Sequence, residues 1–558
     1  MKFSEMPYVH LELTEVETKL KTLITEFKNS KSSTEAIENF NKVYDYANHF
    51  QTMFNLAYIR NTLDTNDEYY TKEVAYINEI HPKIIEVFQD MMSATLNTPF
   101  RSELEAKWGS LLFINEEIGL KTFSPKIIED LQKESKLSSE YAKLMANAKI
   151  DFDGKTLNIA QVGAYLENPN REIRQNALNA KANWFMENIA EFDKLFNELT
   201  ELRTKIAKKL GYENFIKLAY NFRKRNCYDS EMVAEFRKGI LEHIVPVVTK
   251  FKEVQAKRID VENIKMYDIN INYLDGNPKP IGTEKELLEH AKKMYEELDQ
   301  VTGEFFNMML ENELIDVTTR QGKNVGAYCA SLTHYKMPFI FANFNGTSAD
   351  VDILTHEAGH AFASYMARDI SPTILQKYTF DIAEIHSMAM EFLTWDYMDG
   401  FFGEETNKYY ESHLEKAISI IPYIAMVDEF QHVIYENPNM NESERNNYWL
   451  ELEAKYRPWL DLEGIPFYGE GRRWQEQSHI YRTPFYYIDY CLAQVIALYF
   501  WAEKQENHAN AWEKYKKLVS FAGTKTFLEL IEEVSLPNPF VAENLKVIAD
   551  SVTKWLEK

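Results

Sequence analysis

The stretch DVDILTHEAGHAFASYMARD, residues 350–369, carries two histidines and a glutamate on an otherwise apolar segment. Thr347 together with Asp350 forms a capping-box-like start, and Ser371-Pro372 marks a stop. The segment is therefore predicted to be a helix of about five turns. Groups that water solvates this well are costly on a buried helix, so their presence needs an explanation.

His356 and His360 are four positions apart, so on a helix they project from nearly the same face, one turn apart. Two imidazole nitrogens can then reach one zinc ion at about 2.0 to 2.1 Å, while Glu357 faces the open position of the metal. The alternative is a chance H-E-x-x-H on a solvated helix, which the marked ends and the apolar composition disfavour. Met366 stands where a third histidine would be needed, so a downstream carboxylate is expected to complete a site for one Zn2+ per chain.

The segment DIAEIHSMAMEFLTW, residues 381–395, supplies two candidate carboxylates. Glu384 and Glu391 are seven positions apart, which is two helical turns, so they point the same way from a segment rich in Ala, Met and Phe. One of them can bind the metal, and the other can accept the free N–H of a ligating histidine. The alternative for either acid is a structural ion pair. His386 is expected to be a core or surface histidine.

The combination resembles the zinc oligopeptidases of the thimet oligopeptidase and oligoendopeptidase F family. The motif HEAGHAF is followed, 24 residues after its second histidine, by EIHSMAME, and the third ligand of that family is a glutamate that opens an E-x-x-S segment. The resemblance therefore implies that Glu384 is the third metal ligand. The stretches GAYCASL and PFIFANFNGTSADV are similar to the oligoendopeptidase F branch. The match covers most of residues 200–500, and the first 150 residues match only in helical character.

A second cluster, WQEQSHIYRTPFYYIDYC (residues 474–491), resembles the His/Tyr-rich segment of the same family. There a histidine and tyrosines bind the substrate and the oxyanion opposite the zinc, which implies these roles for His479 and Tyr490. Tyr486 and Tyr487 compete for the remaining role, and Tyr486 is favoured because it precedes Tyr490 by one helical turn. Aromatic core packing is the alternative for three rings of this segment: Tyr481, Phe485 and Tyr487.

Helical periodicity dominates the rest of the chain, notably over residues 11–145 and 169–258. Two regions interrupt it with strand-like patterns: a hairpin expected near 149–160 around Asp153-Gly154, and short aromatic strands within 325–346. The predicted fold class is mainly α-helical. The family resemblance implies a two-lobed ellipsoid with a deep substrate channel and small β elements near the zinc site.

The chain is interpreted as an N-terminal helical lobe, residues 1–160, followed by a catalytic region, residues 161–558. Gly and Pro mark an irregular connection within the catalytic region at residues 266–282. The most apolar windows, 417–427 and 491–501, fall short of the roughly 20 residues that span a bilayer, so core helices are expected there.

Composition limits the partners of the protein. Hydrophobic residues make up 45% of the 558 residues and aromatic residues 14%, which indicates a folded globular protein. The net charge of −24 repels nucleic acid and anionic membranes, so neither is expected as a partner, and nothing in the sequence indicates the oligomeric state. The N-terminus shows no export signal. The three cysteines are far apart and form no C-x-x-C pair, which fits a reducing, cytoplasmic location.

The motif predicts a zinc site that activates water, and the family resemblance implies a zinc-dependent oligoendopeptidase that hydrolyses internal peptide bonds of short unstructured peptides. Glu357 would take the proton of an activated water and later protonate the leaving amine, while imidazole or phenol donors hold the oxyanion. A peptidyl-dipeptidase is the nearest alternative, because related enzymes share the ligand spacing. A non-catalytic peptide-binding protein on the same fold is an alternative of another class, and the intact H-E-x-x-H motif with Glu384 argues against it.

Overall fold

The computed structural model describes residues 1–557, which form two compact units that alternate along the chain. The first unit consists of Met1–Leu120, Lys279–Thr406 and Ile496–Leu536, and the second consists of Lys121–Pro278, Asn407–Val495 and Pro537–Lys558. Compactness does not test where the catalytic region begins, so the boundary near residue 160 stays a prediction.

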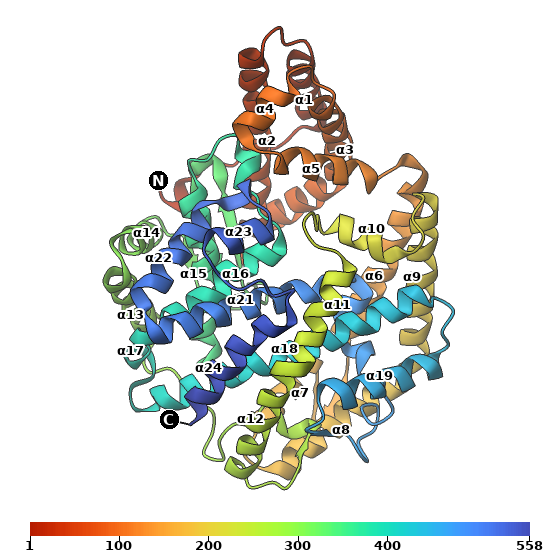
Figure 1. Ribbon diagram of the computed structural model, residues 1–558, viewed down its shortest axis with the longest axis vertical. Coiled ribbons are helices and arrows are strands. Elements are labelled where there is room, and N and C mark those ends of the chain that lie inside the picture. The colour runs from red at the N-terminus through yellow and green to blue at the C-terminus, as the bar shows by residue number, and fades with distance from the viewer. Residues whose placement is uncertain (558) are drawn as a thin grey trace. The chain divides into compact units, whose positions relative to one another are not determined.

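Helices dominate both units, as predicted (Figure 1). In or starting in the first unit they are α1 (Leu13–Lys28), α2 (Ser33–Leu63), α3 (Glu68–Leu96), α4 (Arg101–Trp108), α5 (Leu111–Lys121), α13 (Glu284–Leu298), α14 (Gln300–Glu311), α15 (Ala349–Ala367), α16 (Phe380–Leu393), α17 (Asp399–Phe402), α18 (Thr406–Glu436), α22 (His508–Ser520) and α23 (Phe527–Glu533). Those that start in the second unit are α6 (Ile128–Ala146), α7 (Ile159–Ala164), α8 (Arg171–Glu187), α9 (Ile189–Lys209), α10 (Phe215–Phe222), α11 (Ser230–Gly239), α12 (Val245–Arg258), α19 (Glu442–Tyr456), α20 (Ser478–Arg482), α21 (Tyr487–Glu506) and α24 (Lys546–Leu556).

The helices α1, α2 and α3 pack against one another in the first unit (Figure 1). Capping starts α2, because the Ser32 hydroxyl accepts the Glu35 backbone N–H at 3.2 Å. The buried side chains of α1 recur every three or four positions, which is the spacing that aligns residues on one helical face. They are Val16, Leu20, Leu23, Ile24 and Phe27.

A three-stranded sheet with the order β4-β6-β5 lies beneath α15 in the first unit. The strands β5 (Tyr328–Leu332) and β6 (Met337–Phe341) are antiparallel, which confirms the strands predicted within residues 325–346. The strand β4 (Ile315–Asp316) pairs in parallel with β6 and was not predicted. It is two residues long and its partner lies about 25 positions away, so no local pattern marks it.

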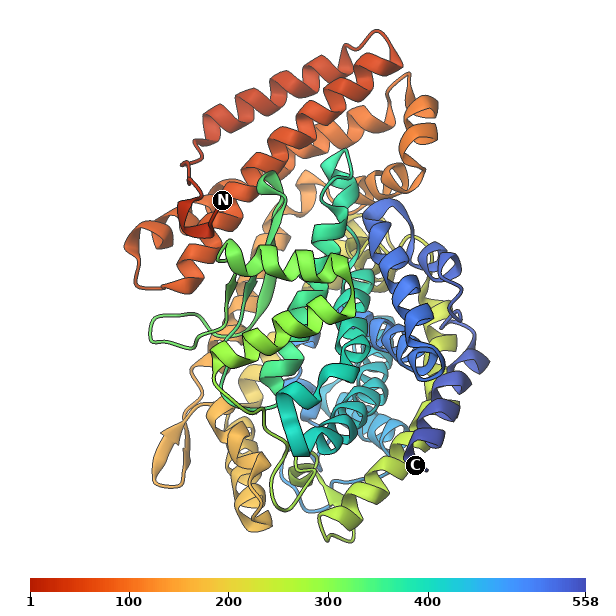
Figure 2. The ribbon, with the colours of Figure 1, turned by 90° about the vertical axis from the view of Figure 1, so that its left-hand side faces the viewer.

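The predicted hairpin is confirmed in the second unit as β1 (Ile150–Phe152) and β2 (Lys155–Leu157), drawn in gold in Figure 2. Its turn residues Asp153 and Gly154 have φ values of 53° and 68°, as a two-residue hairpin turn of this type requires. A further parallel pairing, between β3 (Ile264–Lys265) and β7 (Leu460–Asp461), joins segments far apart in the sequence and was not predicted.

Both apolar windows lie within helices, α18 and α21, and most of their side chains are buried. One described stretch, Asp399–Glu436, is long and apolar enough to cross a membrane by length and composition, and 78% of its apolar window is buried inside the structure. The core helix of a globular protein passes the same test, so this stretch is weak evidence for a membrane span.

Candidate active site

The loop before α15 differs from the predicted capping box. The residue before the helix is Ser348, and its side chain caps nothing. Asp350 instead reaches back, where its carboxylate accepts the backbone N–H of Asn345 at 2.9 Å and of Gly346 at 2.7 Å. Gly346 has a φ of 82°, and this left-handed conformation lets the loop fold over the start of the helix. Asp350 therefore stabilises the loop rather than the helix terminus.

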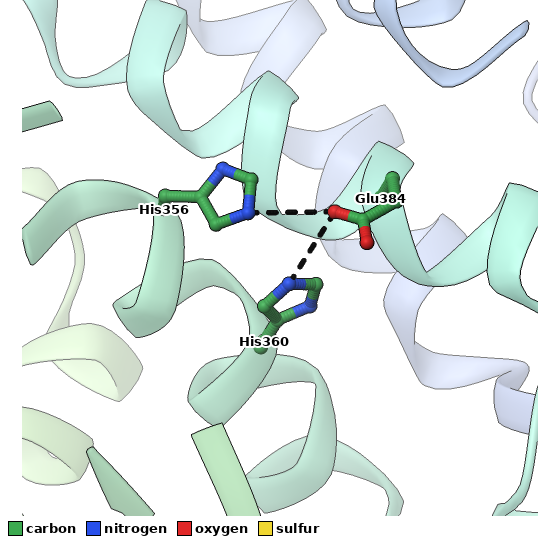
Figure 3. Close-up of side chains that lie close together, drawn as sticks. All are labelled: His356, His360 and Glu384. Carbon is green, nitrogen blue, oxygen red and sulfur yellow. Dashed lines mark ion pairs between the residues drawn. The ribbon is translucent and has the colours of Figure 1, made fainter. Parts of the chain in front are cut away.

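Three side chains that the sequence singled out as metal ligands meet between α15 and α16, and Figure 3 shows them pointing toward one another. The Oε2 atom of Glu384 lies 3.4 Å from Nε2 of His356 and 3.5 Å from Nε2 of His360. Two ligand atoms at about 2.1 Å from a tetrahedral zinc ion would be about 3.4 Å apart. The spacing of these donor atoms therefore fits a zinc ion.

The charge state of Glu384 also suits a cation. Burial by itself raises the pKa of Glu384, but its interactions with His356 and His360 outweigh burial and hold the pKa well below its usual range. The carboxylate is therefore ionised, which is the form that binds metal.

Glu391 is the carboxylate that contacts the second ring nitrogen of a histidine, a role that the helical spacing alone could give to either Glu384 or Glu391. Its Oε1 atom lies 2.7 Å from Nδ1 of His356, on the side of the ring that faces away from Glu384. A metal-ligating histidine usually donates its second ring N–H to a carboxylate, which fixes the ring and leaves the other nitrogen unprotonated for the metal. This contact fits an orienting role for Glu391 and a ligand role for Glu384.

Glu357 has an unusual environment for an acid. Its side chain is 6% exposed, and its Oε2 atom has no hydrogen-bond partner within the described residues. Burial raises the pKa of Glu357, and the nearby His356 and His360 partly oppose this rise. An orphaned buried carboxylate oxygen is costly for stability, so it is typical of a group kept for chemistry.

His386 is a core residue, as expected. Its ring is fully buried beside the ring of Tyr378, and neither ring nitrogen has a hydrogen-bond partner within residues 1–557. Burial lowers the pKa of His386 to about 3, with a smaller contribution from His360. The ring is therefore neutral and lies outside the cluster of metal donors.

Gly359 explains how α15 and α16 come close enough to bring His356, His360 and Glu384 together, and it was not singled out from the sequence. A Cβ atom at this position would lie 2.4 Å from the backbone oxygen of His386 and 2.7 Å from Cα of Ser387. Both contacts are to the backbone of α16, which cannot move away like a flexible side chain. A residue with no side chain is therefore required here, between the two histidines of the motif.

We expect Gly359→Ala to destabilise the protein by about 1 to 3 kcal/mol, the usual cost of overpacking. The added methyl group must push α16 away, and Glu384 lies on that helix, so zinc affinity should fall as well. Gly163→Ala in α7 is a matched control, because a Cβ there meets nothing within 4 Å. Thermal unfolding and zinc titration of both variants check this. An unchanged Gly359→Ala variant would contradict the close-packing requirement.

The second predicted cluster lies in the second unit. The ring of His479 stacks on Tyr487 with centroids 4.3 Å apart, and its centroid lies 5.9 Å from that of Tyr486 and 6.2 Å from that of Tyr490. The hydroxyls of Tyr486 and Tyr490 are 3.0 Å apart. Tyr487 thus stacks on the imidazole ring, whereas the hydroxyl of Tyr486 contacts that of Tyr490. This arrangement favours Tyr486 over Tyr487 as the second tyrosine predicted to bind the substrate or the oxyanion.

Core packing accounts for two other rings of this segment, Tyr481 and Phe485, which are fully buried. Arg223 was not singled out from the sequence, yet its guanidinium lies 4.8 Å from the ring centroid of Tyr486. It is distant in sequence and carries no motif, so no local signal could have found it. The structure thus brings together the metal donors in one unit and the His/Tyr cluster in the other.

Comparison with known proteins gives matches over nearly the whole chain. A family model described as the Peptidase M3 N-terminal domain matches residues 3–123, and one described as Peptidase family M3 matches residues 164–549. A solved structure of PZ peptidase A with an inhibitor is 43% identical, has a TM-score of 0.92, and is matched over 100% of this chain and 99% of that chain.

Curated relatives are more distant. Oligopeptidase PepF of Bacillus subtilis is 24% identical over 64% of this chain and 55% of its own length, so the match spans about half of that protein. An oligoendopeptidase F homolog of Borreliella burgdorferi is 23% identical over 80% of this chain and 75% of its own length.

Proposed function

Because this chain belongs to peptidase family M3, in its oligoendopeptidase F branch, we propose that it is a zinc-dependent endopeptidase that hydrolyses internal bonds of short unstructured peptides. The observation that carries the proposal is the set of donor atoms on His356, His360 and Glu384 at the spacing of a tetrahedral zinc site. Glu357 lies on α15 with the two histidines, and its buried Oε2 atom has no hydrogen-bond partner within residues 1–557.

Each residue has a distinct part in the proposed reaction. A bound zinc ion would polarise the scissile carbonyl and make an attacking water more acidic. Glu357 accepts the proton of that water and passes it to the leaving amine. The donors of His479, Tyr490 and Tyr486 stabilise the oxyanion, and this role requires that they reach it during catalysis.

The open edge of β5 suits an extended peptide. The Ser331 carbonyl accepts a hydrogen bond from the Asn55 side chain at 2.8 Å, so it points away from β6. Backbone polar groups alternate between the two edges of a strand, which places the N–H and C=O of Cys329 on the same open edge. An unfolded peptide can add to such an edge as a further strand.

The alternatives are separable by product analysis. A peptidyl-dipeptidase would not cleave an internally quenched peptide with both ends blocked, whereas an endopeptidase would. A non-catalytic peptide-binding protein has no use for a buried acid such as Glu357 beside a proposed metal site.

Mass spectrometry of a mixed peptide pool, incubated with and without a chelator, tests the proposal. We expect internal cleavage that stops after chelation and returns with added zinc, because a three-ligand site with an open position binds metal reversibly. Metal analysis of the purified protein should find about one zinc per chain, from the single donor set among the described residues. Full activity after chelation, or no stoichiometric metal, would reject the zinc mechanism.

We further propose that short peptides are the partners and that the protein acts in the cytoplasm. The net charge of −24 disfavours nucleic acid and anionic membranes, and the three cysteines lie far apart in the sequence and form no C-x-x-C pair. Fractionation of cells that express the protein checks the location.

A further inference from the structure

A chain of hydrogen bonds leads to the Nδ1 edge of the His479 imidazole, whose face stacks on Tyr487. The hydroxyl of Tyr423 donates to Oε1 of Gln477 at 2.9 Å. The amide Nε2 of Gln477 lies 2.6 Å from Nδ1 of His479. All three residues belong to the second unit, so the chain is complete within it.

The direction of this chain follows from the proton of Tyr423. The phenol is buried, with 7% of the residue exposed. The guanidinium groups of Arg473 and Arg457 lie 4.2 Å and 5.0 Å from its ring centroid, and a guanidinium group can only donate. The hydroxyl proton therefore goes to Gln477, the one acceptor that contacts it within the described residues.

That assignment fixes the direction of the next hydrogen bond, between Gln477 and His479. With its oxygen turned to Tyr423, Gln477 presents its NH2 group to His479, and an NH2 group can only donate. Nδ1 of His479 must then accept, so a neutral ring carries its proton on Nε2. We infer that Gln477, held in orientation by Tyr423, is a positioning residue that fixes His479 as the Nε2–H tautomer, ready to donate toward the oxyanion.

This inference rests on the proposed function for its catalytic meaning, while the tautomer itself can be measured without activity. The ring must be neutral for a tautomer to matter. Burial, followed by the charges of Arg223 and Arg482, lowers the pKa of His479 to about 4. The other groups around the ring are the neutral phenols of Tyr486, Tyr487 and Tyr490. His479 therefore carries a single proton near neutral pH.

The decisive variant is Gln477→Glu, with Gln477→Met as a control of similar size that cannot hydrogen-bond in either direction. A carboxylate at 477 would accept the proton of Nδ1 and so reverse the tautomer. We expect kcat near neutral pH to fall by about 10²-fold, the lower range for one lost oxyanion donor. The nearby carboxylate also favours the doubly protonated ring, which keeps Nε2–H, so kcat of Gln477→Glu should recover as the pH falls. The kcat of Gln477→Met should fall less and should not recover as the pH falls.

Nitrogen NMR of the full-length protein with 15N-labelled histidine reads the tautomer directly, and loss of the signal in His479→Asn assigns it. The wild type should show Nε2 protonated and Nδ1 unprotonated, Gln477→Glu should show Nδ1 protonated at neutral pH, and Tyr423→Phe should give a mixture. A wild-type ring with its proton on Nδ1, or equal losses and flat pH profiles in both Gln477 variants, would overturn the inference. If the protein cleaves no peptide, the proposed function fails, but the spectrum still decides the tautomer.

Discussion

Glu357→Gln is expected to lower kcat by about 10²- to 10⁴-fold, the share that general-base catalysis usually supplies, while zinc content stays unchanged. Glutamine has the size of glutamate but cannot accept the proton of water. The proposed ligand atoms belong to His356, His360 and Glu384, so the substitution leaves them all in place. Since Oε2 of Glu357 has no hydrogen-bond partner to lose among the described residues, the fold should tolerate the amide. Steady-state kinetics together with metal analysis of the same sample check this expectation.

Tyr490→Phe is the matched control for Glu357→Gln, because it removes a donor rather than a base. It should keep zinc and lower kcat by about 10²- to 10³-fold with little change in KM. A raised KM with an unchanged kcat would make Tyr490 a substrate contact, and no change in either would pass the role to Tyr486 or Tyr487. If Glu357→Gln itself kept wild-type turnover with zinc bound, another group would have to be the base.

The parts of this site that were predictable from sequence are those whose residues lie close together in the chain at a regular spacing. Two histidines four apart must share a helical face, and Glu384 and Glu391 two turns apart must share another. The hairpin around Asp153-Gly154 was predictable for the same reason, because its turn chemistry is local. In each case the residues that define the feature lie within about two helical turns of one another.

One feature that was missed depends on the conformation of a local loop, and two others depend on contacts between segments far apart in the sequence. Asp350 carries a sequence signature of a capping box, yet it bonds the preceding loop, because Gly346 lets that loop fold back. The need for Gly359 appears only when α16 is placed against α15. Gln477 lies two residues from His479, but the orientation of its amide group is set by Tyr423, which is more than fifty positions away.

Glu384→Ala and Glu391→Ala separate the metal ligand from the residue that orients it. Glu384 contacts both histidine Nε2 atoms through one oxygen, so its loss leaves only two protein ligands. Glu391 contacts His356 at the other ring nitrogen, so its loss leaves all three donors. We therefore expect Glu391→Ala to bind zinc about 10- to 100-fold more weakly, the usual cost of losing an outer partner. Glu384→Ala should lose more than this and be isolated without metal.

Glu391→Gln is the control that tests whether the hydrogen bond to His356 is the reason for the expected order of zinc affinities. Its amide oxygen can still accept the N–H of His356, so zinc affinity should lie between that of the wild type and that of Glu391→Ala. Zinc titration against a competing chelator measures all three variants. If Glu391→Ala alone emptied the site while Glu384→Ala kept its metal, the two roles would be reversed. In that case the contact of Glu384 with both histidines would be an ion pair rather than a shared coordination site.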